Sequence, residues 1–285
     1  MAFSTAGVGA ILATLTLYFG MHYYVKYKPR NQITAGRVLH AAIVIFGSIV
    51  LSGFILTSVT VADVFFIIIC IVSIGMVLYS CKGSKSMLLQ GFAFLIYLTI
   101  SVVFWAIFYQ IFMSSTLLIE RLVNTNVFGW HIPTARFLSF EALGAMVFGL
   151  AVGKLWFYLA EKGRAVHDGV KFSISLVIIA IAFGIVLLGL YLKTDTAELS
   201  ALWIISSYMC IALGELCLSP IGLSIANKLA PQGYSALFVG IWYASSGLSG
   251  KLAAITADLA AIPKDMRNTV EIAHVYMSAY THFII

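Results

Sequence analysis

The chain has 285 residues, of which 61% are hydrophobic and only 10% are charged. Soluble domains carry about 25% charged residues, so this composition excludes an ordinary soluble domain and indicates a membrane protein. The formal net charge is +6 at pH 7, and its distribution along the chain, given below, leaves no reason to expect a nucleic-acid partner.

Long apolar segments run through the whole chain. A membrane-spanning helix needs roughly 20 mostly apolar residues, and backbone polar groups in lipid need internal partners, so such segments form helices. We therefore predict an all-α integral membrane protein with about eight complete spans and the start of a ninth. In chain order these are 3–25, 38–58, 62–80, 87–119, 134–160, 170–192, 199–227 and 234–262, with a partial span from about 273.

The basic residues outside the spans lie unevenly in the loops. Ten Lys and Arg lie in the loops that follow the first, third, fifth and seventh spans, and five lie in the loops on the opposite side. Because basic residues concentrate in cytoplasmic loops, the side with ten is expected to be cytoplasmic and the N-terminus outside. The net positive charge is then mostly a mark of topology.

Both ends of the sequence look incomplete. Met1 leads almost directly into an apolar span, without the basic segment that begins a secretory signal. The last apolar segment, 273–285, gives about three helical turns, too few to cross a membrane. We expect the interior of a larger helical bundle without its first and last helices.

Catalytic and metal-binding patterns are absent from the sequence. The four cysteines and six histidines have no metal-ligand spacing and form no nucleophile–base pair with an orienting group. There is no Gly-rich phosphate loop and no HExxH motif. We therefore expect no enzyme activity, no cofactor and no metal.

Polar residues separate two regions of the chain. The spans 38–58 and 62–80 are apolar throughout and joined by a short turn, which predicts a peripheral pair that faces lipid. From the fourth span onward polar residues enter the helices. The most unusual is Glu215, near the middle of 199–227. An ionised carboxylate at that depth is costly, so it should face the bundle interior or a water-filled cavity.

Several motifs together resemble one family. "GELCLSPIGLSIANKLAP" (214–231) followed by "FVGIWYASSGLSGKLA" (238–253) resembles helices ten and eleven of the proton-dependent oligopeptide transporters. "FWAIFYQIFMSS" (104–115) is similar to their helix seven, "GWHIPTARFLSFEALGAMVFG" (129–149) to helix eight, and "EKGRAVHDGVKFSISL" (161–176) to the connection into helix nine. The motifs occur in family order over essentially the whole chain, with the strongest likeness to bacterial di- and tripeptide permeases.

This resemblance implies a truncated major-facilitator fold in a bacterial inner membrane. Residues 1–30 would be the last helix of the N-terminal half, 31–86 a cytoplasmic linker and an extra helix pair, and 87–285 the C-terminal bundle. The motifs that the family carries on its first, fourth and fifth helices have no counterpart in the sequence. Since substrates in this fold lie between the two halves, we expect an N-terminal transporter half as partner.

The resemblance also implies a binding role for Glu215, which would contact the free amino group of a substrate peptide and could take up a proton. The alternative is a structural carboxyl, protonated or paired with Lys251 on the next span. Trp242 would belong to an aromatic wall for peptide side chains, or else pack against lipid or other helices.

Three further positions match cavity residues of the family. Gln110 and Phe108 would line the cavity or merely pack. Ser219, four residues after Glu215 and hence on the same helix face, would orient the carboxylate or bond to its own backbone.

Two departures from the family pattern concern the amine site. Tyr109 stands where many relatives have Glu, and Gly144-Ala145 stands where helix eight usually has Asn-Pro. Glu141 lies one turn from Gly144 but nearer the outer surface. It is not expected to replace the amine ligand that the family's Asn would supply at this position.

The sequence thus predicts the C-terminal portion of a proton-coupled di- or tripeptide symporter, with peptides, protons and the lipid bilayer as partners. The alternative is a non-transporting remnant or scaffold fragment of an interrupted transporter gene.

Overall fold

A computed structural model describes Thr16 and residues 34–284, except 56, 128, 194–197, 264–265 and 267. The chain divides into two compact units, Met1–Phe65 and Phe66–Ile285. The span expected at 3–25 lies outside the described residues, apart from Thr16.

The first unit contains α2 (Ala35–Ile55) and the first turns of α3 (Val59–Ser80). In the turn between them, the Thr57 hydroxyl donates a hydrogen bond to the Phe54 carbonyl oxygen at 2.6 Å. None of the apolar stretch Val38–Ile55 is buried, so α2 presents hydrocarbon side chains all around.

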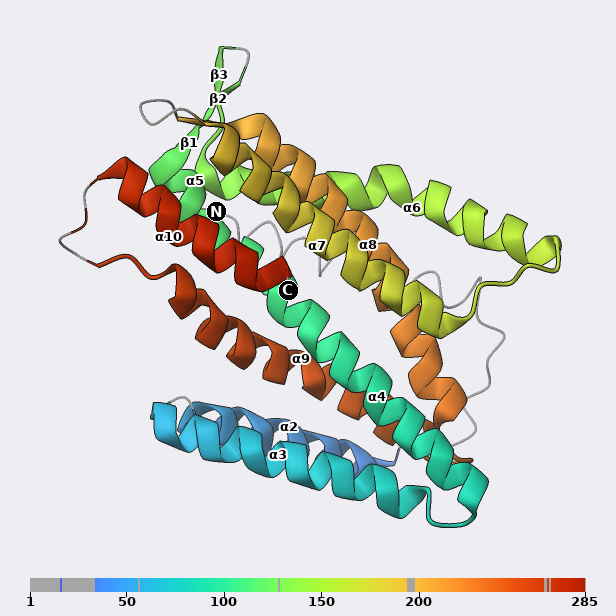
Figure 1. Ribbon diagram of the computed structural model, residues 1–285. Helices are drawn as coiled ribbons and strands as arrows, with labels where there is room; N and C mark the ends of the chain where they lie inside the picture. Colours follow the sequence, from blue (N-terminus) through green and yellow to red (C-terminus); the bar gives the residue numbers. More distant parts are fainter. Residues whose placement is uncertain are drawn as a thin grey trace. The chain divides into compact units, whose positions relative to one another are not determined.

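The second unit is a helical bundle with short extended pieces at one end (Figure 1). The strand β1 (Val123–Asn124) pairs in parallel with β4 (Leu199–Ser200), and β2 (Asn126–Val127) pairs antiparallel with β3 (Trp130–His131). Besides the rest of α3, the helices are α4 (Lys85–Phe108), α5 (Ser114–Leu122), α6 (Leu138–Glu161), α7 (Asp168–Leu192), α8 (Ala201–Leu229), α9 (Ser235–Ala257) and α10 (Thr269–Ile284), with 3₁₀ turns η1 (Tyr109–Ile111), η2 (Thr134–Phe137) and η3 (Asp258–Ala260).

Small residues allow the bundle helices to approach closely. Helix α8 packs along α7, as Figure 1 shows, and it also contacts α6, α9 and α4. A Cβ added at Gly189 of α7 would lie 2.6 Å from the Trp203 ring, and one at Gly144 of α6 would lie 2.9 Å from the Ala212 Cβ. Glycine at such positions lets helix backbones come together, as is common between membrane helices.

The segment expected as one span at 87–119 is broken in its second half. Helix α4 ends at Phe108, η1 follows, and α5 begins at Ser114. A break frees backbone carbonyls that need partners away from water. The Tyr208 hydroxyl of α8 donates to the freed Ile111 carbonyl oxygen at 3.2 Å, so a neighbouring helix stabilises the break.

The expected span count is reproduced only in part. Among the described residues, six helices are long and apolar enough to cross a membrane, counting 85–122 as one. Helix α9 is not one of the six, although its 23 residues suffice in length, because its serines and Lys251 make it less apolar. Helix α10 has only 16 residues. An all-α membrane fold is thus established, whereas eight complete spans are not.

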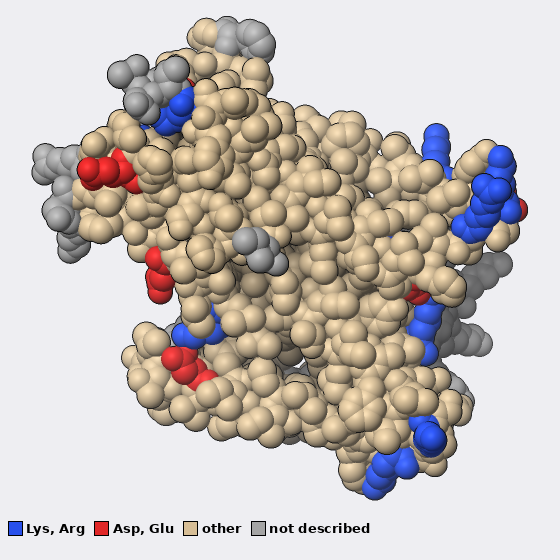
Figure 2. All heavy atoms as spheres, in the orientation of Figure 1, with Lys and Arg blue, Asp and Glu red and all other residues tan. Residues whose placement is uncertain are grey.

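Most charged side chains of the second unit lie near the ends of its helices; Lys154, Glu215 and Lys251 are exceptions. Figure 2 shows Lys and Arg gathered where the α6–α7 and α3–α4 connections lie, with uncharged surface over the helices between their ends. These connections contain Lys82, Lys162 and Arg164. Such a distribution is typical of helices that cross a hydrocarbon layer.

Candidate functional site

Glu215 is the central residue of α8, fourteen positions from either end of this 29-residue helix. The helix begins where the Ser200 hydroxyl accepts a hydrogen bond from the Leu202 backbone N–H at 3.4 Å. The preceding residue, Gly214, is buried. A Cβ added to it would lie within 3.4 Å of the Ser175 carbonyl oxygen and of the Phe104 ring. Glu215 itself is half-buried, so its carboxyl lies at the edge of the packed core and at mid-membrane depth.

The partner of Glu215 is a second acid. Its carboxyl lies close to that of Glu141 on α6, near enough for the two charges to interact. The close approach of α6 and α8 at Gly144 and Ala212 brings these helices together one turn from each acid. Two carboxylates at such close range repel each other when both are ionised, so a proton or another cation is stabilised between them.

Trp242 of α9 lies inside the packing between helices. Its side chain is only 7% exposed, and its ring lies edge-on to Phe172, with centroids 6.3 Å apart. A Cβ added at Gly222 of α8 would lie 2.0 Å from the indole ring. The indole therefore fills the space that Gly222 leaves, and it joins α7, α8 and α9.

Gln110 is fully buried in η1 and its amide is satisfied. The Nε2 group donates to the Ala253 carbonyl oxygen at 2.9 Å and to the Thr256 hydroxyl at 2.8 Å. Its Oε1 accepts a hydrogen bond from the Ser114 hydroxyl at 2.8 Å. This arrangement ties the break between α4 and α5 to the end of α9. Phe108, at the end of α4, is 5% exposed and lies edge-on to Trp105.

Ser219 and Lys251 are both half-buried. Ser219 lies one turn beyond Glu215 on α8, and Lys251 lies in the C-terminal third of α9. The structure brings Glu141 close to Glu215, although the sequence analysis expected Glu141 to lie nearer the outer surface.

The predicted substrate residues thus fall into two groups. Phe108, Gln110 and Trp242 are buried in contacts between helices of this chain, while Glu215 and Ser219 remain half-exposed on α8. Among the described residues, no group of three or more His, Cys, Asp or Glu could hold a metal ion.

Sequence reasoning overlooked a cluster of buried tyrosines near the helix break. Tyr280 of α10 shares a hydrogen bond with the Ser115 hydroxyl at 2.8 Å, and Tyr276 accepts one from Arg121 at 3.5 Å. Tyr276 and Tyr280 are one turn apart and share a helix face. This spacing is the pattern in the sequence from which the cluster could have been predicted.

The long apolar helices, with most of their charges near the ends, define a multi-pass helical membrane protein. The sequence model of the POT family (PTR2) matches residues 1–272, so the chain belongs to the POT family. This confirms the resemblance read from the motifs on α4, α6, α8 and α9.

Similar proteins and structures agree with this assignment. Dipeptide and tripeptide permease A of Serratia proteamaculans is 25% identical over 293 residues, which cover 99% of this chain and 55% of that protein. The peptide transporter YePEPT of Yersinia enterocolitica is 34% identical over 153 residues, 53% of this chain and 30% of the relative. The chain thus spans little more than half the length of relatives that it matches from end to end.

Solved structures of the family share the fold. Tetrameric PepTSo2 matches with a TM-score of 0.76 at 22% identity, over 99% of this chain and 58% of that one. A POT family transporter solved in complex with 5-aminolevulinic acid matches with a TM-score of 0.72 at 22% identity, over 99% and 60%. At this identity the likeness establishes the fold alone.

Proposed function

We propose that this chain forms the C-terminal half of a proton-coupled symporter for di- and tripeptides and supplies one wall of its central cavity. Membership of the POT family supports the class, and a relative matched over 99% of the chain is named a dipeptide and tripeptide permease. The observation that carries the proposal is the proximity of two carboxyls, Glu215 at the centre of α8 and Glu141 in the first turn of α6.

Glu215 binds the ammonium group of the peptide. An ammonium is a charge-assisted donor, and its attraction to a carboxylate is stronger in a low-dielectric cavity than in water. Glu141 supplies additional acceptor oxygens beside the same place. With one proton between them the two acids still carry one negative charge, so the pair can hold the ammonium and the proton at the same time, as symport requires.

The remaining parts of the proposal follow the family fold. Residues 1–30 act as the last helix of the N-terminal half, 31–86 as a linker with the extra helix pair, and 87–285 as the C-terminal bundle. The opposite cavity wall comes from an N-terminal half. The protein lies in a bacterial inner membrane with the N-terminus outside and the loop with Lys162 and Arg164 in the cytoplasm.

Reconstituted uptake tests this function. Membrane vesicles would contain this chain together with the N-terminal half of the Serratia permease, this chain alone, or that half alone. We expect uptake of a labelled dipeptide, driven by a proton gradient, only when both halves are present. Uptake by this chain alone, above that of empty vesicles, would contradict the shared cavity.

Matched glutamate variants make the test specific. Glu215→Gln should abolish most of the restored uptake, whereas Glu161→Gln, at the end of α6 and exposed, should leave it unchanged. Equal uptake by the two variants would show that the central carboxylate has no part in transport.

A further inference from the structure

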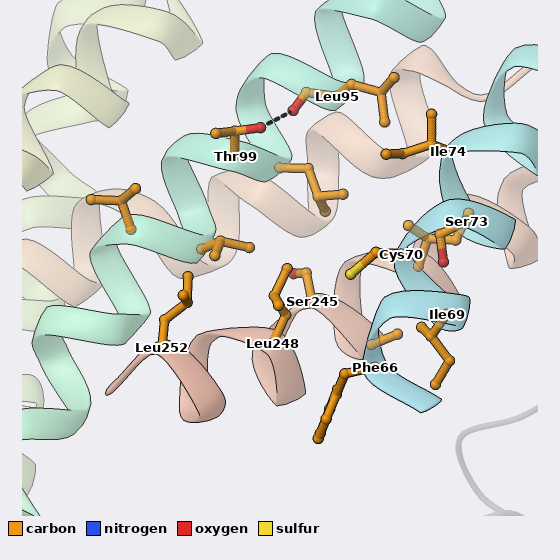
Figure 3. A pocket seen from close by; sticks show the side chains of 15 residues that line it. Phe66, Ile69, Cys70, Ser73, Ile74, Leu95, Thr99, Ser245, Leu248 and Leu252 are labelled. Carbon is orange, nitrogen blue, oxygen red and sulfur yellow. Dashed lines mark hydrogen bonds between the residues drawn. The ribbon is translucent and has the colours of Figure 1, made fainter. Parts of the chain in front are cut away.

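A cavity of about 390 Å³ lies between α3, α4 and α9, within the second unit. Figure 3 shows Cys70 and Ser73 of α3, Thr99 of α4, and Ser245 and Leu248 of α9 around this space. None of these residues belongs to the carboxyl pair described above. The volume falls in the range of about 300–1,000 Å³ that is usual for small-molecule sites.

The lining of the cavity is almost entirely hydrocarbon. Of its fifteen lining residues, eleven have hydrocarbon side chains, three carry hydroxyls and one is a cysteine. The Thr99 hydroxyl donates to the Leu95 carbonyl oxygen at 2.9 Å, and the Ser245 hydroxyl donates to the Trp242 carbonyl oxygen at 2.6 Å. Both donors are thus satisfied within their own helices. Water needs two to four polar partners to occupy a cavity, so the natural occupant is apolar.

The cavity lies in the middle turns of all three helices. It is bounded by α3 between Phe66 and Ile74, by α4 between Leu95 and Val103, and by α9 between Ile241 and Leu252. In a membrane of ordinary thickness these turns lie near the bilayer centre. The abundant molecules at that depth are lipid acyl chains.

On either side of the cavity, single residues of α4 and α9 come close to α3 or to the residue that follows it. A Cβ added at Gly91 of α4 would lie 3.0 Å from the Cys81 sulfur, just beyond the end of α3, and one at Gly247 of α9 would lie 3.5 Å from the Phe66 ring. Between these two contacts the facing side chains stand apart. An empty apolar cavity forfeits van der Waals contacts along its whole lining, so an occupant that fits is stabilised.

We propose that this cavity binds one acyl chain of a membrane phospholipid. A peptide substrate has charged ends, and no charged side chain lines the cavity. An acyl chain is narrow, apolar and flexible, and like the lining it is almost entirely hydrocarbon.

Photocrosslinking in membranes tests the site directly. Membranes that contain the full chain would be loaded with phosphatidylcholine carrying a diazirine in the middle of one acyl chain, then irradiated and mapped by mass spectrometry. We expect label at Thr99, Ser245 and Leu248, which lie around the cavity, as well as at Ile71, which is 66% exposed on α3 and does not line it. The ratio of the Leu248 label to the Ile71 label measures occupancy of the cavity.

Variants that fill the cavity provide the control. Ala244→Phe from α9 and Ser73→Phe from α3 place a ring in the space from opposite walls, whereas Ile71→Phe adds the same ring to the exposed face. We expect both filling variants to lose most of the Leu248 label relative to Ile71, and Ile71→Phe to keep the label at Leu248.

Three results would overturn the proposal. These are label confined to exposed residues, label at Leu248 that both filling variants retain, and crosslinked dimers of the chain in place of lipid adducts. None of them depends on transport, so the test is independent of the proposed function.

Discussion

Helices α3 and α7 are equally apolar in sequence but have opposite surroundings. Their membrane-spanning stretches have the same mean hydropathy, yet only 6% of the α3 stretch is buried against 39% of the α7 stretch. In α7, Gly189 lies under the Trp203 ring and Phe183 lies edge-on to Tyr280 at 5.3 Å. In α3, the space around Gly75 is open to 4 Å. Hydropathy therefore indicates that a helix crosses the membrane, but not whether it packs against other helices. Small residues opposite aromatic rings indicate where a neighbouring helix packs.

The largest expected effect compares two glycine substitutions. Gly222→Ala should destabilise the bundle by about 1–3 kcal/mol, because the added methyl group meets the rigid, buried Trp242 ring and overpacking has this cost. Gly75→Ala should be neutral or stabilising by about 0.5–1 kcal/mol, because the site is open and Ala favours the helix. Thermal unfolding in detergent measures both, and an equal loss in the two variants would contradict the packing.

The second prediction concerns buried and exposed hydrogen bonds. Gln110→Leu leaves the Ala253 carbonyl and the Thr256 hydroxyl without this donor, so we expect a loss of about 1–3 kcal/mol. Ser48→Ala removes a bond to the Ile45 carbonyl oxygen on exposed α2 and should change stability by less than about 0.5 kcal/mol. If Gln110→Leu instead weakened peptide affinity and left stability unchanged, Gln110 would be a substrate ligand and not a structural link between helices.

The third prediction tests whether Glu141 and Glu215 act together. Glu141→Gln and Glu215→Gln should each reduce uptake in the two-half system, and the double variant should lose less than the sum of the two. We expect a coupling free energy of about 0.5–3 kcal/mol, as for residues in direct contact. Strictly additive losses would place the two acids in independent roles.

The smallest expected effect lies where the first turn of α7 meets the last turn of α8. Lys228 contacts Asp168 at 3.1 Å, but its side chain is 63% exposed. Lys228→Ala should therefore cost less than about 1 kcal/mol. A loss as large as that of Gly222→Ala would mean that this ion pair, and not the apolar packing, holds the helix ends together.

The sequence was sufficient for the membrane class, for the family and for the described helices other than the division between α4 and α5. Periodic apolar runs and basic loops carry this information residue by residue. It was insufficient for the break between Phe108 and Ser114, because the freed Ile111 carbonyl accepts from the nearby Thr116 hydroxyl at 2.9 Å and also from the buried Tyr208 hydroxyl of α8. The local pattern contains Thr116 but no record of Tyr208.

The candidate site shows the same limit. Glu215 stood out because a lone acid within an apolar segment is costly. Its contact with Glu141 depends on how α6 and α8 cross at Gly144, which no single segment specifies. The burial of Gln110 and Trp242 likewise depends on where α9 packs.

The most direct test of the account measures uptake of two dipeptides in the two-half system, one with a free amino group and one N-acetylated, normalised to folded protein. Glu215→Gln should weaken recognition of the free dipeptide by about 2–5 kcal/mol, because one partner of a desolvated charge pair is lost. The acetylated dipeptide carries no ammonium and should be affected much less. An equal loss for both, recovered by adding Lys251→Met as for a buried structural ion pair, would contradict the assignment of Glu215 to the substrate amine.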